Sequence, residues 1–418
     1  MTNKKVLVIA YYFPPMGLSG VQRTLKFTKF LPQYGWTPIV LSASPRSFYA
    51  YDEELLSEIN PDDTMIYRTE QNSNVRKTAK FPSYFMQKIG RAFLQTIHQP
   101  DSKITWKKKA VELGRQILSE HKVDAIFATA PPFTDFLVAL ELSREFDIPF
   151  IVDYRDVWID NPFHFYATPF HKLYAENLEK QILTYAQKVV VTGRHTKELL
   201  LKRYGMLGHE DVVIIPHGYD QEDFDNAGRI TPDREKFTIT HSGLFQDDRT
   251  PKYFLKALSL FIKENPQAAA HVNAKFIGIM RKGHTRMIKK YKLDGVTKCL
   301  GYLPHDQTIA ELMSSDVLWL MLKDDVRTPG KLYEYFGARK PIIASLPDGA
   351  MKKLAVDTQA CIATYPKDVA SIKNAIARMY ELWSKRILPT PDEEYVESFD
   401  RYKLTALLAK ELAQTLKI

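Results

Sequence analysis

Short, unbroken apolar runs recur along the chain, and each precedes a segment with helical periodicity. Such runs predict strands buried on both faces, which is typical of parallel sheets covered by helices. The first series of predicted strands comprises Val6–Ala10, Thr37–Leu41, Ala125–Ala128, Phe150–Val152, Val189–Val191 and Val212–Ile215. The second series comprises Phe237–Thr240, Lys275–Ile277, Val317–Leu320 and Ile342–Ala344. The pattern predicts an α/β chain with two doubly wound, Rossmann-like domains facing a cleft.

A polar, turn-rich segment, "PHGYDQEDFDNAGRITPDREK", separates the two series. We therefore expect an N-terminal domain over residues 1–220, a linker over 221–236 and a C-terminal domain over 237–395. Residues 396–418 have helical periodicity without a strand of their own. We expect this C-terminal helix to pack back toward the N-terminal domain.

Charge is unevenly distributed along the chain. Its 418 residues carry a formal net charge of +9, and residues 71–122 hold eleven Lys and Arg against three acidic residues. Such an excess indicates an anionic partner: lipid headgroups, a phosphorylated substrate or nucleic acid. Within it, Phe85, Ile89, Phe93 and Ile97 recur at helical spacing, which fits a helix on an anionic membrane or one packed on its own core.

Composition favours a soluble protein of a reducing compartment. The two cysteines, Cys299 and Cys361, lack metal-type spacing, and no stretch approaches the roughly 18 apolar residues of a membrane span. No targeting segment is recognised. We expect a cytoplasmic protein, at most peripheral on the inner face of the membrane.

Glycines follow the first predicted strand, in the loop from Gly17 to Gly20. They let backbone amides approach an anion, and the following helix N-terminus adds positive potential. A tight strand-to-helix turn would use the same glycines. The spacing matches neither the dinucleotide-binding fingerprint nor the P-loop, so both classes lack their motif here.

The second series repeats this arrangement. Gly243 follows its first strand, and Arg249 and Lys252 lie where an amphipathic helix begins. We expect one of these two cations to pair with a phosphate while amides near Gly243 bind another oxygen. The alternative is that Arg249 pairs with Asp247 or Asp248.

A third stretch, "RTPGKLYEYFGARKPIIAS", opens a helix with Gly330 and Lys331, which suits an anion. Glu334 follows on the same helix. A carboxylate can accept hydrogen bonds from both hydroxyls of a diol such as ribose, although a solvated helix residue has the same pattern.

Charged residues also follow a strand of the first series, in "FIVDYRDVW". We expect Asp153, Arg155 and Asp156 to be catalytic residues that orient acceptor hydroxyls or accept a proton. A structural ion pair between strand and helix is the alternative.

Together these stretches resemble the family-4 retaining glycosyltransferases of GT-B fold. The likeness covers most of the chain, including the Gly17–Gly20 loop, "PHGYD", "SGLF" with Arg249, and "KLYEYFGARKPIIAS". The resemblance implies that the N-terminal domain binds the acceptor and the C-terminal domain binds a nucleotide-diphosphate sugar. It places Arg249, Gly330 and Lys331 at the donor diphosphate. Glu334 corresponds to the second glutamate of the family's Glu-x7-Glu motif, which holds the donor ribose.

Two positions depart from the family pattern. Val326 stands in place of the first glutamate of that motif, and Asp156 stands where the family often has a histidine. The sugar and the stereochemical outcome therefore stay open. The resemblance otherwise implies a retaining transfer in cell-surface polysaccharide synthesis.

No metal or other cofactor is expected, because "FQDDRT" and "LKDDVR" are not Asp-x-Asp motifs and basic residues replace the metal in the resembled fold. The expected partners are a nucleotide-diphosphate sugar, a glycan or lipid-linked acceptor and an anionic membrane surface at residues 71–122, with no nucleic acid. The alternatives are a nucleotide-sugar epimerase of the same fold and a non-catalytic protein that binds anions or nucleic acid.

Overall fold

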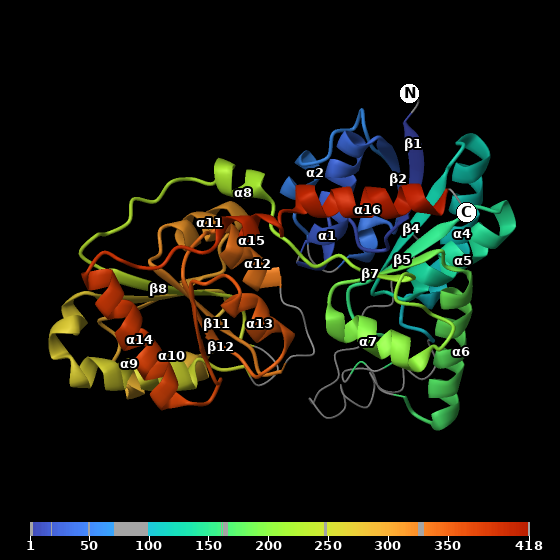
Figure 1. Cartoon of the computed structure of the whole chain (residues 1–418). Coiled ribbons are helices and arrows are strands. Elements are labelled where there is room, and N and C mark those ends of the chain that lie inside the picture. Colours follow the sequence, from blue (N-terminus) through green and yellow to red (C-terminus); the bar gives the residue numbers. More distant parts are fainter. Residues whose placement is uncertain are drawn as a thin grey trace. The chain divides into compact units, whose positions relative to one another are not determined.

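The chain forms two compact units, residues 1–216 with 402–418 and residues 217–401 (Figure 1). The computed structural model describes residues 3–17, 19–48, 51–70, 99–159, 161, 166–245, 249–324 and 330–416. The aromatic stripe predicted at residues 85–97 lies outside these ranges, as does Val326.

The first unit is built on a parallel seven-stranded sheet with the order β3-β2-β1-β4-β5-β6-β7. Its strands are β1 (Lys4–Ile9), β2 (Trp36–Ser42), β3 (Met65–Arg68), β4 (Ala125–Ala130), β5 (Phe150–Tyr154), β6 (Lys188–Val191) and β7 (Val212–Ile214). Its helices are α1 (Ser19–Phe30), α2 (Glu54–Ser57), α4 (Lys107–Glu120), α5 (Thr134–Phe146), α6 (Pro169–Tyr185), α7 (Arg194–Arg203) and α16 (Arg401–Thr415). Two apolar clusters pack against this sheet.

The second unit has a parallel six-stranded sheet with the order β10-β9-β8-β11-β12-β13. Its strands are β8 (Phe237–Ser242), β9 (Val272–Ile277), β10 (Thr297–Gly301), β11 (Val317–Met321), β12 (Ile342–Ser345) and β13 (Cys361–Thr364). Its helices are α8 (Gln221–Asn226), α9 (Lys252–Glu264), α10 (Lys282–Lys290), α11 (His305–Met313), α12 (Gly330–Gly337), α13 (Ala350–Val356), α14 (Val369–Ser384) and α15 (Glu393–Glu397). Its two apolar clusters are likewise confined to one unit.

The predicted fold class, two doubly wound α/β halves, is confirmed. All ten predicted strands are present, and most of them are buried, continuous apolar runs. The structure adds three edge strands, β3, β10 and β13, which the pattern did not reveal. Their side chains are mostly half-buried or exposed, and their apolar runs are at most three residues long.

The segment after β7 belongs to the second unit, and nearly all of the last helix belongs to the first. Residues 221–236 begin with α8, whose Phe224 is buried beside Tyr219 in the second unit. The last helix, α16, buries Leu404, Leu408 and Leu412 in a cluster of the first unit. No helix among the described residues is long and apolar enough to cross a bilayer.

Candidate functional site

The strand order of the second sheet reverses between β8 and β11. Strands β9 and β10 are added on one side of β8, and β12 and β13 are added on the far side of β11. Open α/β sheets bind ligands beyond the carboxyl ends of their strands at such a switch point. The pairing of β8 with β11 stops at Thr240, whereas β8 stays paired with β9 as far as Ser242. The end of β8 therefore has an unpaired side, where side chains from elsewhere can enter.

Gly243 forms the turn directly after β8. Its φ of 136° lies in the region that favours glycine, and a Cβ built on it would lie 1.2 Å from the Lys331 Nζ. Its N–H donates to the Ile277 carbonyl at 2.7 Å. Gly278, just after β9, is also closely packed, because its Cβ would lie 2.6 Å from the Gly243 carbonyl oxygen. Two glycines thus let neighbouring strand ends meet backbone to backbone.

Lys331 reaches this turn from the first residues of α12. Its Nζ donates to the Ser242 carbonyl at 2.6 Å. Burial lowers the pKa of Lys331 to about 8, the Glu334 carboxylate opposes that shift, and the Arg249 charge adds to it. An anion bound nearby would stabilise the charged form of Lys331.

A small pocket opens beside the Gly243 turn. Its walls come from the ends of β8 and β11 and from α12, and they comprise His241, Leu244, Phe245, Arg249, Leu320, Met321, Leu322 and Lys331. Arg249 and Lys331 therefore line one cavity. Burial lowers the pKa of His241 to about 3, and the Lys331 charge adds to the shift. The His241 ring, whose Nδ1–H donates to the Trp319 carbonyl at 2.9 Å, is thus neutral at pH 7.

The other predicted residues of this unit lie around the pocket without lining it. Glu334 is half-buried, one turn after Lys331 on α12, and Gly330 opens that helix with no described atom within 4 Å of a Cβ built on it. Lys252 is exposed at the start of α9, with its Nζ 5.5 Å from the centre of the Tyr253 ring. The structure therefore brings Gly243, Arg249 and Lys331 together and leaves Lys252 outside the pocket.

Comparison with known proteins identifies the class. Residues 72–223 match the family model described as Glycosyltransferase Family 4. Residues 72–223 therefore resemble a family-4 glycosyltransferase domain. The predicted resemblance and the prediction of a glycosyltransferase are thereby confirmed. No curated protein matches the chain.

Solved structures show that this glycosyltransferase has the GT-B fold. A glycosyltransferase from Rickettsia africae aligns over 100% of both chains with 16% identity and a TM-score of 0.65. Anabaena HepE in complex with UDP aligns over 98% of this chain and 100% of its own, with 15% identity and a TM-score of 0.65. Sucrose-phosphate synthase from Thermosynechococcus elongatus aligns over 99% of both chains, with 13% identity and a TM-score of 0.66.

In the first unit of the glycosyltransferase, Asp153 is fully buried. It pairs with Arg23 at 2.8 Å and accepts a hydrogen bond from the Thr129 hydroxyl at 2.8 Å. Arg23 also donates to the carbonyls of Ile215 and Pro216, where the chain leaves β7. This is the structural ion pair left open by the sequence, with Arg23 rather than Arg155 as the partner of Asp153.

Arg155 is likewise engaged with backbone. Its guanidinium donates to the carbonyls of Gly20, Ala130 and Pro131, joining the start of α1 to the end of β4. Burial lowers the pKa of Arg155, while the neighbouring carboxylates, that of Asp153 first, oppose the shift. Asp156 differs from both, because its side chain is exposed at the carboxyl end of the sheet.

The first glycine loop packs against protein atoms. A Cβ on Gly17 would lie 3.3 Å from the Asp52 Cβ, and one on Gly20 would lie 3.6 Å from the Arg155 guanidinium. Gly17 is therefore closely packed against Asp52, whereas Gly20 is exposed on the first turn of α1 and makes an ordinary contact with Arg155. Their predicted contact with the donor stays a prediction.

Two buried polar residues, Asp135 and Tyr335, were not predicted from the sequence. Asp135 on α5 is fully buried, accepts a hydrogen bond from the Tyr11 N–H at 2.9 Å, and has a pKa raised well above its usual range by burial. Tyr335 on α12 is fully buried and binds the end of β8. In the sequence, the one signal for either residue is a polar side chain at a position on the apolar face of its helix.

Part of the positive charge predicted for residues 71–122 is neutralised by acidic residues of α5. In the described part of this segment, Lys107 pairs with Glu141 at 2.6 Å and Arg115 pairs with Glu145 at 2.9 Å. Both acids belong to α5, so a count over residues 71–122 did not include them. The membrane role of this surface stays a prediction.

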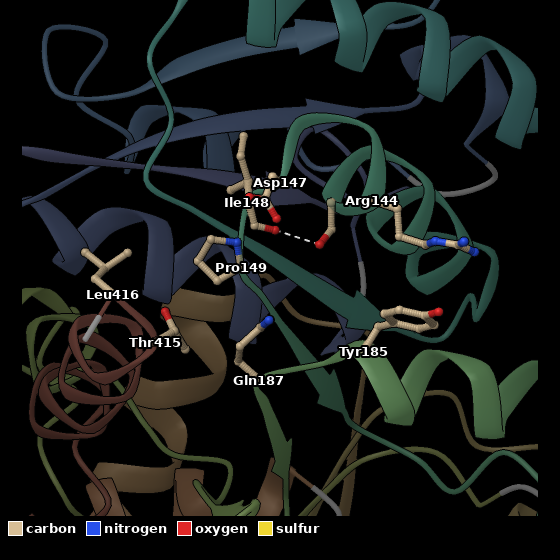
Figure 2. A pocket seen from close by; sticks show the side chains of 9 residues that line it. Arg144, Asp147, Ile148, Pro149, Tyr185, Gln187, Thr415 and Leu416 are labelled. Carbon is tan, nitrogen blue, oxygen red and sulfur yellow. Dashed lines mark hydrogen bonds between the residues drawn. The ribbon is translucent and has the colours of Figure 1, made fainter. Parts of the chain in front are cut away.

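A larger cavity, of about 720 Å³, lies at the amino ends of strands β5 and β6 of the first sheet (Figure 2). It lies near the start of β5, where Gln187 accepts a hydrogen bond from the Phe150 N–H at 2.7 Å. Because ligands of doubly wound sheets bind at the carboxyl ends of strands, this cavity is not the candidate site.

Proposed function

We propose that this protein transfers a sugar from a nucleoside-diphosphate sugar to a glycan or lipid-linked acceptor. The observation that carries the proposal is that Arg249 and Lys331 line one pocket beside the Gly243 turn. Two cations and a glycine turn at a switch point suit a diphosphate. The neighbouring structures support this ligand class, because Anabaena HepE was solved with UDP and with UDP-glucose.

The two cations also support a transfer without a metal ion. Charge develops on the leaving diphosphate in the transition state, and fixed cations in a partly buried pocket stabilise it. We propose a retaining outcome in which the donor phosphate assists deprotonation of the acceptor hydroxyl. Activity that survives EDTA is the expected result, and rescue of a chelated enzyme by Mn²⁺ or Mg²⁺ would contradict it.

In the first unit, we propose that Asp156 faces the acceptor, since its exposed carboxylate lies at the carboxyl end of the sheet. Asp153 and Arg155 act through the backbone that they hold. Asp156→Asn is expected to lower kcat without changing donor affinity. Wild-type kcat in this variant would remove Asp156 from the reaction.

Donor binding is tested by titration calorimetry with UDP, GDP and ADP. Arg249→Met is expected to weaken binding of the preferred diphosphate by about 1.5–3 kcal/mol, because a charge-assisted hydrogen bond is lost. The matched control is Arg378→Met, which removes an exposed arginine paired with Glu381 on α14. Failure of the wild type to bind any nucleoside diphosphate would overturn the proposal. An epimer formed from donor alone would favour the epimerase instead.

We also propose that the enzyme is cytoplasmic and makes peripheral contact with an anionic membrane during polysaccharide synthesis. The supporting observation is on α6, where Phe170, Leu173 and Tyr174 are 80%, 54% and 54% exposed, with Lys172 between them. Aromatic and aliphatic side chains beside a lysine suit a lipid interface. Co-sedimentation with anionic vesicles should fall in Phe170→Ser/Leu173→Ser, and a wild type that ignores such vesicles at low salt would contradict the proposal.

A further inference from the structure

The end of β8 is held by side chains of a helix that follows in the chain almost 90 residues later. The regular ladder between β8 and β11 stops at Thr240, so the backbone of Ser242 has no β11 partner in that ladder. A buried backbone group without a hydrogen bond would cost free energy. Other groups must therefore form hydrogen bonds with the backbone N–H and C=O of Ser242.

Tyr335 supplies one half of the replacement. Its hydroxyl accepts a hydrogen bond from the Ser242 N–H at 2.9 Å and donates to the Trp319 carbonyl at 3.2 Å. The hydroxyl therefore lies between the two strands and bridges them where direct pairing has ended. Tyr335 is fully buried, so this bridge is shielded from water.

Lys331 supplies the other half. Its Nζ donates to the Ser242 carbonyl at 2.6 Å and occupies the space in which a Cβ of residue 243 would lie. Lys331 and Tyr335 are four residues apart on α12, so they project from one face of the helix. One helix face thus grips both backbone polar groups of a single residue.

We propose that Lys331 and Tyr335 act as a clamp on Ser242 that positions the Gly243 turn to bind the donor diphosphate. The proposal rests on the proposed function, because it assigns the clamp's purpose to the donor site. Tyr335 is a positioning residue, since its hydroxyl reaches the pocket only through Ser242. Lys331 combines this role with its place in the pocket wall.

The clamp predicts that the two side chains are coupled. Tyr335→Phe should weaken binding of UDP, or of whichever diphosphate the wild type prefers, roughly tenfold, because a buried N–H loses its acceptor. Lys331→Met should weaken it at least as much. The double variant should bind no more weakly than Lys331→Met alone, because either substitution already frees the turn.

Matched controls separate positioning from general loss of stability. Tyr395→Phe removes a hydroxyl that donates to the Leu354 carbonyl in the same unit. Lys236→Met removes an ammonium that donates to the Ala270 carbonyl, just before the other end of β8. Both controls should keep wild-type affinity for the diphosphate.

Hydrogen exchange of the ligand-free protein gives a readout that does not depend on the donor. Amides of residues 237–245 should exchange faster in Tyr335→Phe than in wild type, and should be unchanged in Tyr395→Phe. Unchanged exchange, or affinity losses that add in the double variant, would overturn the clamp. If the wild type binds no nucleoside diphosphate, the proposed function fails and the exchange comparison alone decides whether the clamp exists.

Discussion

At the scale of single residues, the structure divides the predicted charged residues by what they contact. Lys331 and Arg249 line a pocket, whereas Asp153 and Arg155 are satisfied by protein groups. The sequence places all four after strands, where ligands bind, but it does not show that Arg23 on α1 reaches Asp153. Contacts across 130 positions of the chain depend on the packing of helix against sheet, which no local spacing encodes.

Gly243→Ala is expected to abolish diphosphate binding and to destabilise the second unit. The new Cβ would displace the Lys331 ammonium, and φ of 136° is costly for alanine by about 1–3 kcal/mol. Gly295→Ala is the matched control, because nothing lies within 4 Å of its Cβ and its φ is not positive. Urea unfolding and diphosphate titration measure both effects, and wild-type behaviour of Gly243→Ala would show that the turn is not constrained.

Lys331 also predicts a pH dependence of stability. Its pKa falls from 10.5 to about 8 on folding, chiefly through burial, so between these values the unfolded chain binds more protons than the folded one. Stability of the second unit should therefore rise from pH 8 to pH 10.5, by about 3 kcal/mol relative to Lys331→Met, and should show no such difference in slope below pH 8. Unfolding curves of the two proteins across this range measure the difference, and parallel curves would contradict the assigned pKa.

At the scale of elements, the central strands were predictable, whereas three of the four edge strands were not. The run Ala125–Ala128 lies in the middle of the first sheet, so both of its faces select apolar residues. The edge strand Thr297–Gly301 is covered less and carries Lys298 and Cys299 as exposed residues. A pattern that depends on burial therefore finds the central strands of a sheet and misses most of its edge strands, with β7 as the exception.

The Arg23–Asp153 pair joins three elements of the first unit, α1, β5 and the exit from β7. Asp153→Asn is expected to lower the free energy of unfolding of this unit by about 3–5 kcal/mol, because it leaves a buried guanidinium without its counterion. Replacing both partners, in Arg23→Met/Asp153→Leu, should recover part of that loss. Urea unfolding decides the point: a variant of Asp153 with native stability but no activity would instead make it a catalytic residue.

At the scale of the whole molecule, each apolar cluster among the described residues lies within one unit. A fragment of residues 217–401 should therefore fold alone, unfold cooperatively and bind the diphosphate with an affinity close to that of the full chain. Circular dichroism and calorimetry test this. A fragment that folds but binds no diphosphate would mean that the first unit contributes to the donor site, as predicted for Gly17 and Gly20.

The two ends of that second unit are fastened to each other. The Tyr219 N–H donates to the Phe399 carbonyl at 3.2 Å, and the Arg401 N–H donates to the Tyr219 carbonyl at 2.8 Å. The unit is in effect an insertion with neighbouring ends, carried between β7 and α16 of its host. Genetic recombination at these two positions would exchange the whole insertion and leave the host core whole. Under the proposed function, such an exchange would replace the donor pocket and keep the fold of the first unit.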